Sequence, residues 1–201
     1  MLSLVAGQNN LSGTLPVELA SLSGSLTAID LLTNQIEGTI PEELFRMKKL
    51  NYLNLGYNKF SGTVSAALGD LDQLTYLMLD NNEMTGTIPS ELGKLTQLSG
   101  WLSLEGNKLH GTVPESFQDL TKATWIYLNY NDLTGSIEFL CDALRPVDAP
   151  GGINADASSP LLELWADVAE VECSCCNCCP IVEEEEDPEL FKPVEQGGVG
   201  G

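Results

Sequence analysis

The sequence predicts an α/β repeat solenoid, in which short parallel strands and helical turns stack in six units of about 24 residues each, a length typical of one such repeat. Two observations predict it: asparagine recurs at a nearly constant spacing, and apolar residues recur at fixed offsets around each asparagine. A unit of this length cannot bury its own apolar face, so neighbouring units must stack to form a core. The six asparagines are Asn9, Asn34, Asn58, Asn82, Asn107 and Asn131.

The first part of each unit has the pattern of a short strand. Apolar residues lie five and three positions before the asparagine, as Leu77 and Leu79 do before Asn82. This alternation predicts a strand with one buried face and one exposed face. We expect the asparagine to turn inward and satisfy backbone groups of the adjacent turn, so that the six form a stacked ladder.

The second part of each unit has the pattern of a bend and a helical turn. A glycine follows the asparagine by four positions and suits a tight bend. An aliphatic residue comes two positions later, usually followed by proline. Apolar residues three apart, such as Leu92, Leu95 and Leu98, then predict a helical turn or a short 3₁₀ segment.

Units such as LTYLMLDNNEMTGTIPSELGKLTQL (residues 74–98) resemble the repeat of plant-type extracellular leucine-rich-repeat proteins, including receptor-like proteins and polygalacturonase inhibitors. The resemblance covers residues 2–140 and implies a right-handed horseshoe or superhelix with a parallel sheet on its concave face. Serine and glutamate replace the usual proline at Ser65 and Glu138, and Ala6 and Ala123 replace a usual leucine. The ending CSCCNCC is similar to that of leucine-rich-repeat proteins of diatoms.

The chain divides into three segments by composition. Residues 1–140 form the solenoid, residues 141–180 a cysteine-rich C-terminal cap, and residues 181–201 an acidic, glycine-rich tail that we expect to be disordered. Within the cap, apolar spacing over residues 161–168 predicts a short amphipathic helix that covers the last repeat with Trp165. Met1 falls at the opening position of the first repeat with no cap before it, so we expect a fragment that lacks its N-terminal cap.

The cysteines allow two chemistries. Five of the six lie in a C-x-C-C-x-C-C cluster, and disulfides among them would staple the cap in an oxidising compartment. Closely spaced thiolates also suit a soft-metal cluster. The extracellular repeat type implies disulfides, with pairing that the sequence does not specify. The six cysteines are Cys141, Cys173, Cys175, Cys176, Cys178 and Cys179.

The resemblance implies that a ligand binds across the concave sheet, on the outward residues of the strands. Aromatic residues recur there on adjacent strands, about 4.8 Å apart, which predicts a continuous aromatic ribbon beside acidic residues. Such a ribbon suits a binding hot spot, and it equally suits cross-strand stacking that only stabilises the sheet. The predicted ligand-binding residues are Tyr52, Tyr76, Met78, Asp80, Trp101, Ser103, Glu105, Trp125, Tyr127 and Asn129.

Composition narrows the function. A pI of about 4.1 argues against binding to nucleic acid or to an anionic membrane surface. The chain has a single histidine, His110, which argues against histidine-based acid–base catalysis. We therefore expect no enzyme, no cofactor and no membrane segment in this chain. The sequence predicts an extracellular or cell-surface recognition module for a protein, peptide or glycan, with a co-receptor kinase on another chain. The alternatives are an inhibitor of a secreted polysaccharide hydrolase, a soft-metal-binding protein and a structural wall component.

Overall fold

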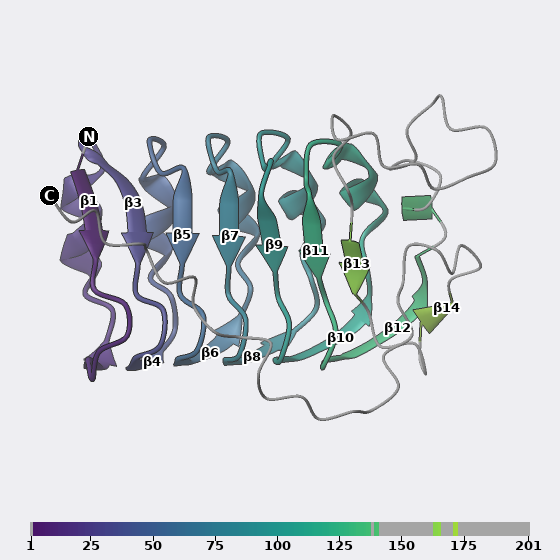
Figure 1. The fold of residues 1–201 in the computed structure, drawn as a ribbon, viewed down its shortest axis with the longest axis horizontal. Coiled ribbons are helices and arrows are strands. Elements are labelled where there is room, and N and C mark those ends of the chain that lie inside the picture. The colour runs from purple at the N-terminus through teal and green to yellow at the C-terminus, as the bar shows by residue number, and fades with distance from the viewer. Residues whose placement is uncertain (1, 138, 141–162, 166–170, 173–201) are drawn as a thin grey trace, which may run out of the picture.

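The computed structural model describes residues 2–137, 139–140, 163–165 and 171–172, and these form two parallel sheets on two sides of a stack of repeats (Figure 1). This confirms the predicted α/β repeat solenoid. The first sheet contains β1 (Leu2–Val5), β3 (Leu26–Asp30), β5 (Tyr52–Asn54), β7 (Tyr76–Met78), β9 (Trp101–Ser103), β11 (Trp125–Tyr127) and β13 (Glu163–Trp165). The second sheet contains β2 (Ser12–Thr14), β4 (Gln35–Gly38), β6 (Lys59–Thr63), β8 (Glu83–Gly86), β10 (Lys108–Thr112), β12 (Asp132–Ser136) and β14 (Val171–Glu172).

A 3₁₀ helix returns the chain from the second sheet to the first in each of the first five repeats. Four of these helices follow a proline in extended conformation, as η4 follows Pro89. Where Ser65 replaces the proline, its hydroxyl accepts a hydrogen bond from the backbone N–H of Ala67, 3.2 Å away, and so caps the helix. The helices are η1 (Val17–Leu22), η2 (Glu42–Arg46), η3 (Ala66–Asp70), η4 (Ser90–Lys94) and η5 (Glu115–Asp119).

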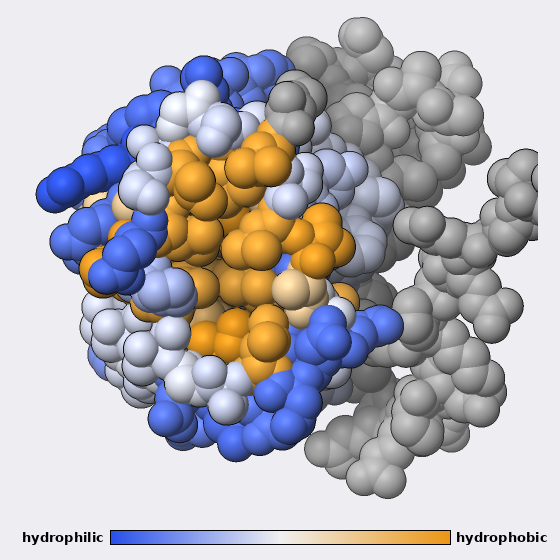
Figure 2. All heavy atoms as spheres, turned by 90° about the vertical axis from the view of Figure 1, so that its left-hand side faces the viewer, coloured by the Kyte–Doolittle hydropathy of each residue, from blue (hydrophilic) through white to orange (hydrophobic). Residues whose placement is uncertain are grey.

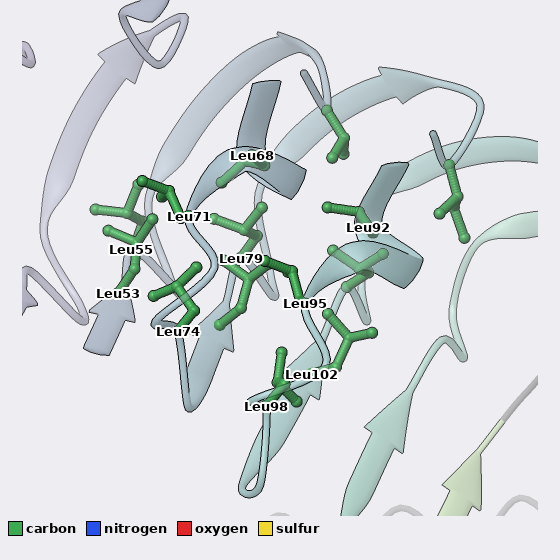
Figure 3. Close-up of a cluster of buried hydrophobic side chains, with 14 of the residues drawn as sticks. Leu53, Leu55, Leu68, Leu71, Leu74, Leu79, Leu92, Leu95, Leu98 and Leu102 are labelled. Atoms are coloured by element: carbon green, nitrogen blue, oxygen red, sulfur yellow. The ribbon is translucent and has the colours of Figure 1, made fainter. Parts of the chain in front are cut away.

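The core lies between the two sheets and the layer of 3₁₀ helices. Leu92, Leu95 and Leu98, which the sequence spaces three apart, are fully buried and point into it, next to Leu68 and Leu71 of the preceding repeat (Figure 3). Each repeat therefore contributes one layer of leucines, and each layer is covered by the next. The 3₁₀ geometry fits this spacing because it places residues three apart on one face.

The asparagines connect the repeats through their amide groups. The Asn82 Nδ2 group donates to the carbonyl oxygens of Leu55, Leu79 and Asp80, each 3.1 Å away, and its Oδ1 atom accepts from the backbone N–H of Phe60 at 2.9 Å. Leu55 and Phe60 belong to the preceding repeat, so one side chain satisfies backbone groups of two repeats. Asn34, Asn58, Asn107 and Asn131 make the same set of contacts. Asn9, which has no preceding repeat among the described residues, is exposed and contacts only the oxygens of Ala6 and Gly7.

The glycine after each asparagine adopts the left-handed backbone that the predicted bend requires. Gly62 has a φ of +83°, and a Cβ atom added to it would lie 2.8 Å from the Thr39 Cγ2 atom of the preceding repeat. The glycine thus permits both the turn and the close approach of a threonine methyl group. The same pairing joins Gly38 to Thr14, Gly86 to Thr63, Gly111 to Thr87 and Gly135 to Thr112.

A second left-handed position recurs immediately before each asparagine. In one repeat it is Gly106, with a φ of +63°, but elsewhere it is a residue with a side chain, including the β-branched Thr33 at +56°. Left-handed backbone is costly for such residues, so the repeated turn imposes this conformation against local preference. The other members of the set are Gln8, Tyr57, Asn81 and Tyr130.

At the C-terminal side, strands replace the expected helix. Strand β13 pairs in parallel with β11, with Tyr127 opposite Trp165 in the register. Strand β14 pairs likewise with β12 of the second sheet. The prediction of a helix over residues 161–168 was wrong for residues 163–165, because a strand there supplies hydrogen-bond partners to the edge of β11, which a helix would leave unpaired.

The opposite end of the solenoid presents an apolar surface. Figure 2 views this end and shows a hydrophobic centre with hydrophilic side chains around it. Large apolar side chains of the first repeat are exposed here, as expected for a layer that no further described residue covers. They are Leu2, Val5, Leu11, Val17 and Leu22.

Candidate functional site

The outer face of the first sheet carries the aromatic residues that the sequence singles out. Tyr52, Tyr76, Trp101 and Trp125 open the strands β5, β7, β9 and β11. The rings of Tyr52 and Tyr76 are 5.5 Å apart and tilted by 45°. The rings of Trp101 and Trp125 are 5.7 Å apart and meet edge to face at 90°. Both arrangements are favourable for aromatic pairs. Tyr76 is 37% exposed and Trp101 is 41% exposed, so each pair offers ring surface to a partner.

The predicted continuous ribbon is divided into two pairs. Tyr76 and Trp101 both belong to the described residues, and no ring contact joins them. The Tyr76 ring instead lies over Gly100, where an added Cβ atom would be 2.1 Å from the Tyr76 Cε1 atom. The repeat from Asn82 to Asn107, which links the Tyr76 strand to the Trp101 strand, is longer by one position than the repeat before it. Gly100 stands directly before the Trp101 strand. The absent side chain leaves space that the tyrosine ring fills.

Two of the predicted contact residues are not available at the surface. Met78 and Ser103 face each other in the register of β7 and β9, and each is only 5% exposed. Their burial counts against a direct contact with a ligand at these two positions, whereas Tyr127, the last residue of β11, is only partly buried. Asn54, at the same position of β5, is also buried, and its Oδ1 atom accepts a hydrogen bond from the backbone N–H of Gly56.

Acidic and amide side chains follow the aromatic rows on the same face. The Asp80 carboxylate lies against Gly56, where an added Cβ atom would be 2.7 Å from Asp80 Oδ1. Burial raises the pKa of Asp80 above its ordinary value, and a hydrogen bond from Asn81 Nδ2, 3.2 Å from Asp80 Oδ2, partly opposes this. Glu105 follows on the next repeat at the equivalent position. The Asn129 Oδ1 atom is buried, and no described residue donates a hydrogen bond to it.

The sequence reasoning missed Tyr57, which belongs to this face. It is exposed, and its pKa is raised by burial and then by the neighbouring charges of Asp80 and Glu105. The signal that could have found it is its position directly before Asn58, where the turn forces a left-handed backbone and directs the side chain outward.

Other predicted sites lie partly or wholly outside the described residues. All six cysteines lie outside the described residues, so the preference for disulfides over a metal cluster stays a prediction. Among the described residues, no group of three or more potential metal ligands occurs. In the same part of the chain, the helices are too short and too polar to cross a membrane.

Comparison with known proteins places these repeats in a family. Residues 24–84 match the family described as "Leucine rich repeat", and residues 101–120 match a second description, "Leucine Rich Repeat". No curated protein matches the chain at a significant level.

Solved structures of plant receptor ectodomains are similar to the chain. The ectodomain of the Arabidopsis thaliana membrane receptor kinase GASSHO1/SCHENGEN3, in complex with CASPARIAN STRIP INTEGRITY FACTOR 2, is 39% identical with a TM-score of 0.66. The Arabidopsis receptor kinase HAESA, in complex with the peptide hormone IDA and the co-receptor SERK1, is 29% identical with a TM-score of 0.63. These matches cover 69% and 67% of this chain but only 16% and 22% of the receptors, so the chain spans less than a quarter of either.

A shorter relative matches over most of its own length. The BIR3–SERK2 complex of Arabidopsis thaliana contains a chain that is 31% identical, with a TM-score of 0.58. The match covers 66% of this chain and 69% of that one. The repeated sequence pattern, the two parallel sheets and these similarities agree. The chain belongs to the leucine-rich-repeat family, with repeats of the kind that form plant receptor ectodomains.

Proposed function

We propose that the chain is a non-catalytic recognition module that binds a protein or peptide across the outer face of its first sheet. The observation that carries the proposal is the pair of exposed aromatic contacts, Tyr52–Tyr76 and Trp101–Trp125, beside the carboxylates of Asp80 and Glu105. Exposed tyrosine and tryptophan side chains are the residue types most enriched in binding hot spots. Leucine-rich-repeat ectodomains are typically binding modules, which supports the same conclusion.

Preorganisation is the mechanism by which this face would bind. The strands are fixed by neighbours on both sides, and the buried asparagines fix the turns that follow them. The aromatic rings are in contact before a ligand arrives, so little rotamer freedom is lost on binding. The two pairs are separate contacts along the sheet, which suits an extended segment with two anchor residues.

The similar receptors support a place outside the cell or at its surface. HAESA is described in complex with a peptide hormone and a co-receptor. For this chain we propose an equivalent extracellular setting, with a peptide or protein ligand and a co-receptor kinase supplied by another chain. Tyr127 and Asn129 extend the proposed face towards β13.

Selection from a random displayed peptide library tests the proposal. Peptides that bind the full chain are expected to lose at least tenfold in affinity for the double variant Trp101→Ala/Trp125→Ala. The same peptides should bind His110→Ala, a control on the second sheet, with unchanged affinity. The thermal midpoints of all variants are compared to confirm folding. Selected peptides that bind the double variant and the original chain equally well would refute the proposed face.

A further inference from the structure

A groove of about 1280 Å³, lined mainly by residues with polar or charged side chains, runs along the edge of the first sheet at which its strands begin. Its lining extends from Leu2 in the first repeat to Lys122 before β11. Five strand spacings separate these limits, which corresponds to a length of about 24 Å. We call it the strand-start groove, and its main lining side chains are Lys48, Lys49, Asn51, Gln73, Gln97 and Lys122.

The charge of this groove is opposite to that of the chain. The chain has 29 acidic and 9 basic residues, so acidic side chains outnumber basic ones about threefold. In the lining of the groove the ratio is reversed, because it contains three lysines and one acidic residue, Asp72. The Asp72 carboxylate is itself engaged by Gln73 Nε2 at 3.2 Å. Lys48 is also paired with the Asp70 carboxylate at 3.7 Å, so the groove carries a small local excess of positive charge on an acidic protein.

The three lysines are held in position across the repeats. The Lys49 ammonium group donates to the Gly24 carbonyl oxygen at 2.6 Å, and that of Lys122 donates to Gln97 Oε1 at 2.8 Å. The Lys48 ammonium donates to the Asp70 carbonyl oxygen at 2.8 Å. Each contact uses one of the three N–H groups of an ammonium, so donors remain for a ligand. The side chains are exposed and already ordered, which lowers the entropic cost of binding.

We propose that the strand-start groove binds an acidic polysaccharide. Hydroxyl and amide side chains, including Asn51, Gln73 and Thr75, line the repeats between the Lys48–Lys49 pair and Lys122, and Leu2 is the single large apolar side chain among the described residues that line the groove. The lysine, hydroxyl and amide groups of this lining suit a long ligand that carries both carboxylates and hydroxyl groups. At physiological salt the Debye length is about 8 Å, so the nearby lysines outweigh the distant negative charge of the chain.

Polygalacturonate, a linear polyuronate, is the probe for this proposal. Binding to the full chain is measured by calorimetry at physiological salt in the presence of a chelator. The triple variant Lys48→Gln/Lys49→Gln/Lys122→Gln is expected to bind at least tenfold more weakly. The matched control is Lys59→Gln/Lys94→Gln/Lys108→Gln, which changes the net charge by the same amount and also breaks one exposed ion pair. Its affinity for polygalacturonate should fall less than twofold.

The remaining measurements distinguish binding in this groove from general charge attraction and from binding on the outer face. Neutral dextran should not bind, and poly-glutamate should bind at least tenfold more weakly than polygalacturonate. Equal losses in both triple variants, or equal binding of poly-glutamate, would overturn the proposal. If the groove variant does not fold, Lys122→Gln alone should still weaken binding about threefold. The double variant Trp101→Ala/Trp125→Ala should bind polygalacturonate with unchanged affinity. The proposal for this groove and the proposal for the outer face can therefore be confirmed or refuted independently.

Discussion

Removal of one buried asparagine amide should destabilise the chain far more than removal of an exposed one. In Asn82→Ala, the buried N–H of Phe60 loses its acceptor, and three carbonyl contacts of 3.1 Å disappear. A buried donor left without a partner costs about 1–3 kcal/mol, and net values near 1 kcal/mol apply to ordinary hydrogen bonds. Because the three carbonyl oxygens share one amide group, we expect a total loss of about 3 kcal/mol in the free energy of unfolding.

Urea unfolding followed by circular dichroism measures this loss. With typical slopes for the dependence on urea, about 3 kcal/mol corresponds to a midpoint shift of roughly 1–3 M. Asn9→Ala is the matched control, because Asn9 is exposed and contacts only two carbonyl oxygens of its own repeat. Asn9→Ala should lower the free energy of unfolding by less than about 1 kcal/mol. If Asn82→Ala and Asn9→Ala are equally stable, the asparagines do not hold neighbouring repeats together, and the reasoning is refuted.

Three further perturbations test other parts of the structure. Gly62→Ala should lower the free energy of unfolding by about 1–2 kcal/mol, because alanine is strained in the left-handed backbone at this position. Adding Thr39→Ser should restore part of this loss, because it removes the methyl carbon that would lie 2.8 Å from the new Cβ atom. Full stability of Gly62→Ala alone would contradict this reasoning. Thr33→Gly should gain roughly 0.5–1 kcal/mol, whereas Thr121→Gly, outside the left-handed set, should not; equal effects in thermal unfolding would count against strain at Thr33. Burial raises the pKa of Asp80, so its ionisation opposes folding above the unfolded pKa, and Asp80→Asn should stabilise the chain at pH 7 but not near pH 3; a gain that is independent of pH would disprove this.

Much of the fold could be predicted because its determinants recur in every repeat. The alternation at Leu77 and Leu79 predicts a strand, and Gly62 predicts a left-handed turn. Both predictions depend only on local sequence and not on distant residues. The split of the aromatic ribbon could not be predicted in this way. It depends on the direction in which the Tyr76 ring turns, and that direction is set by the empty space over Gly100.

The other differences also involve packing between segments. Met78 and Ser103 alternate as outward residues should, yet both are buried, and alternation alone carries no information about how far a side chain on that face is exposed. Residues 163–165 have apolar spacing that suits a helix, but the open edge of β11 offers them backbone partners. A local pattern cannot show which edge of a sheet is free, so the sequence favoured the wrong element.

The hydrogen bonds of the asparagines also bear on how such a chain can change in length. Each amide serves the backbone of its own repeat and the one before it, and the same contacts recur from Asn34 to Asn131. Gain or loss of one whole repeat therefore leaves every internal amide with a complete set of partners. The repeat from Asn82 to Asn107 is one position longer than the repeat before it, yet the Asn107 Oδ1 atom still accepts from the Met84 N–H at 3.0 Å, so the extra residue lies away from the asparagine contacts. Among relatives of this protein, length differences within the solenoid should accordingly come in whole repeats, and shorter insertions should lie in the loops that the asparagines do not contact.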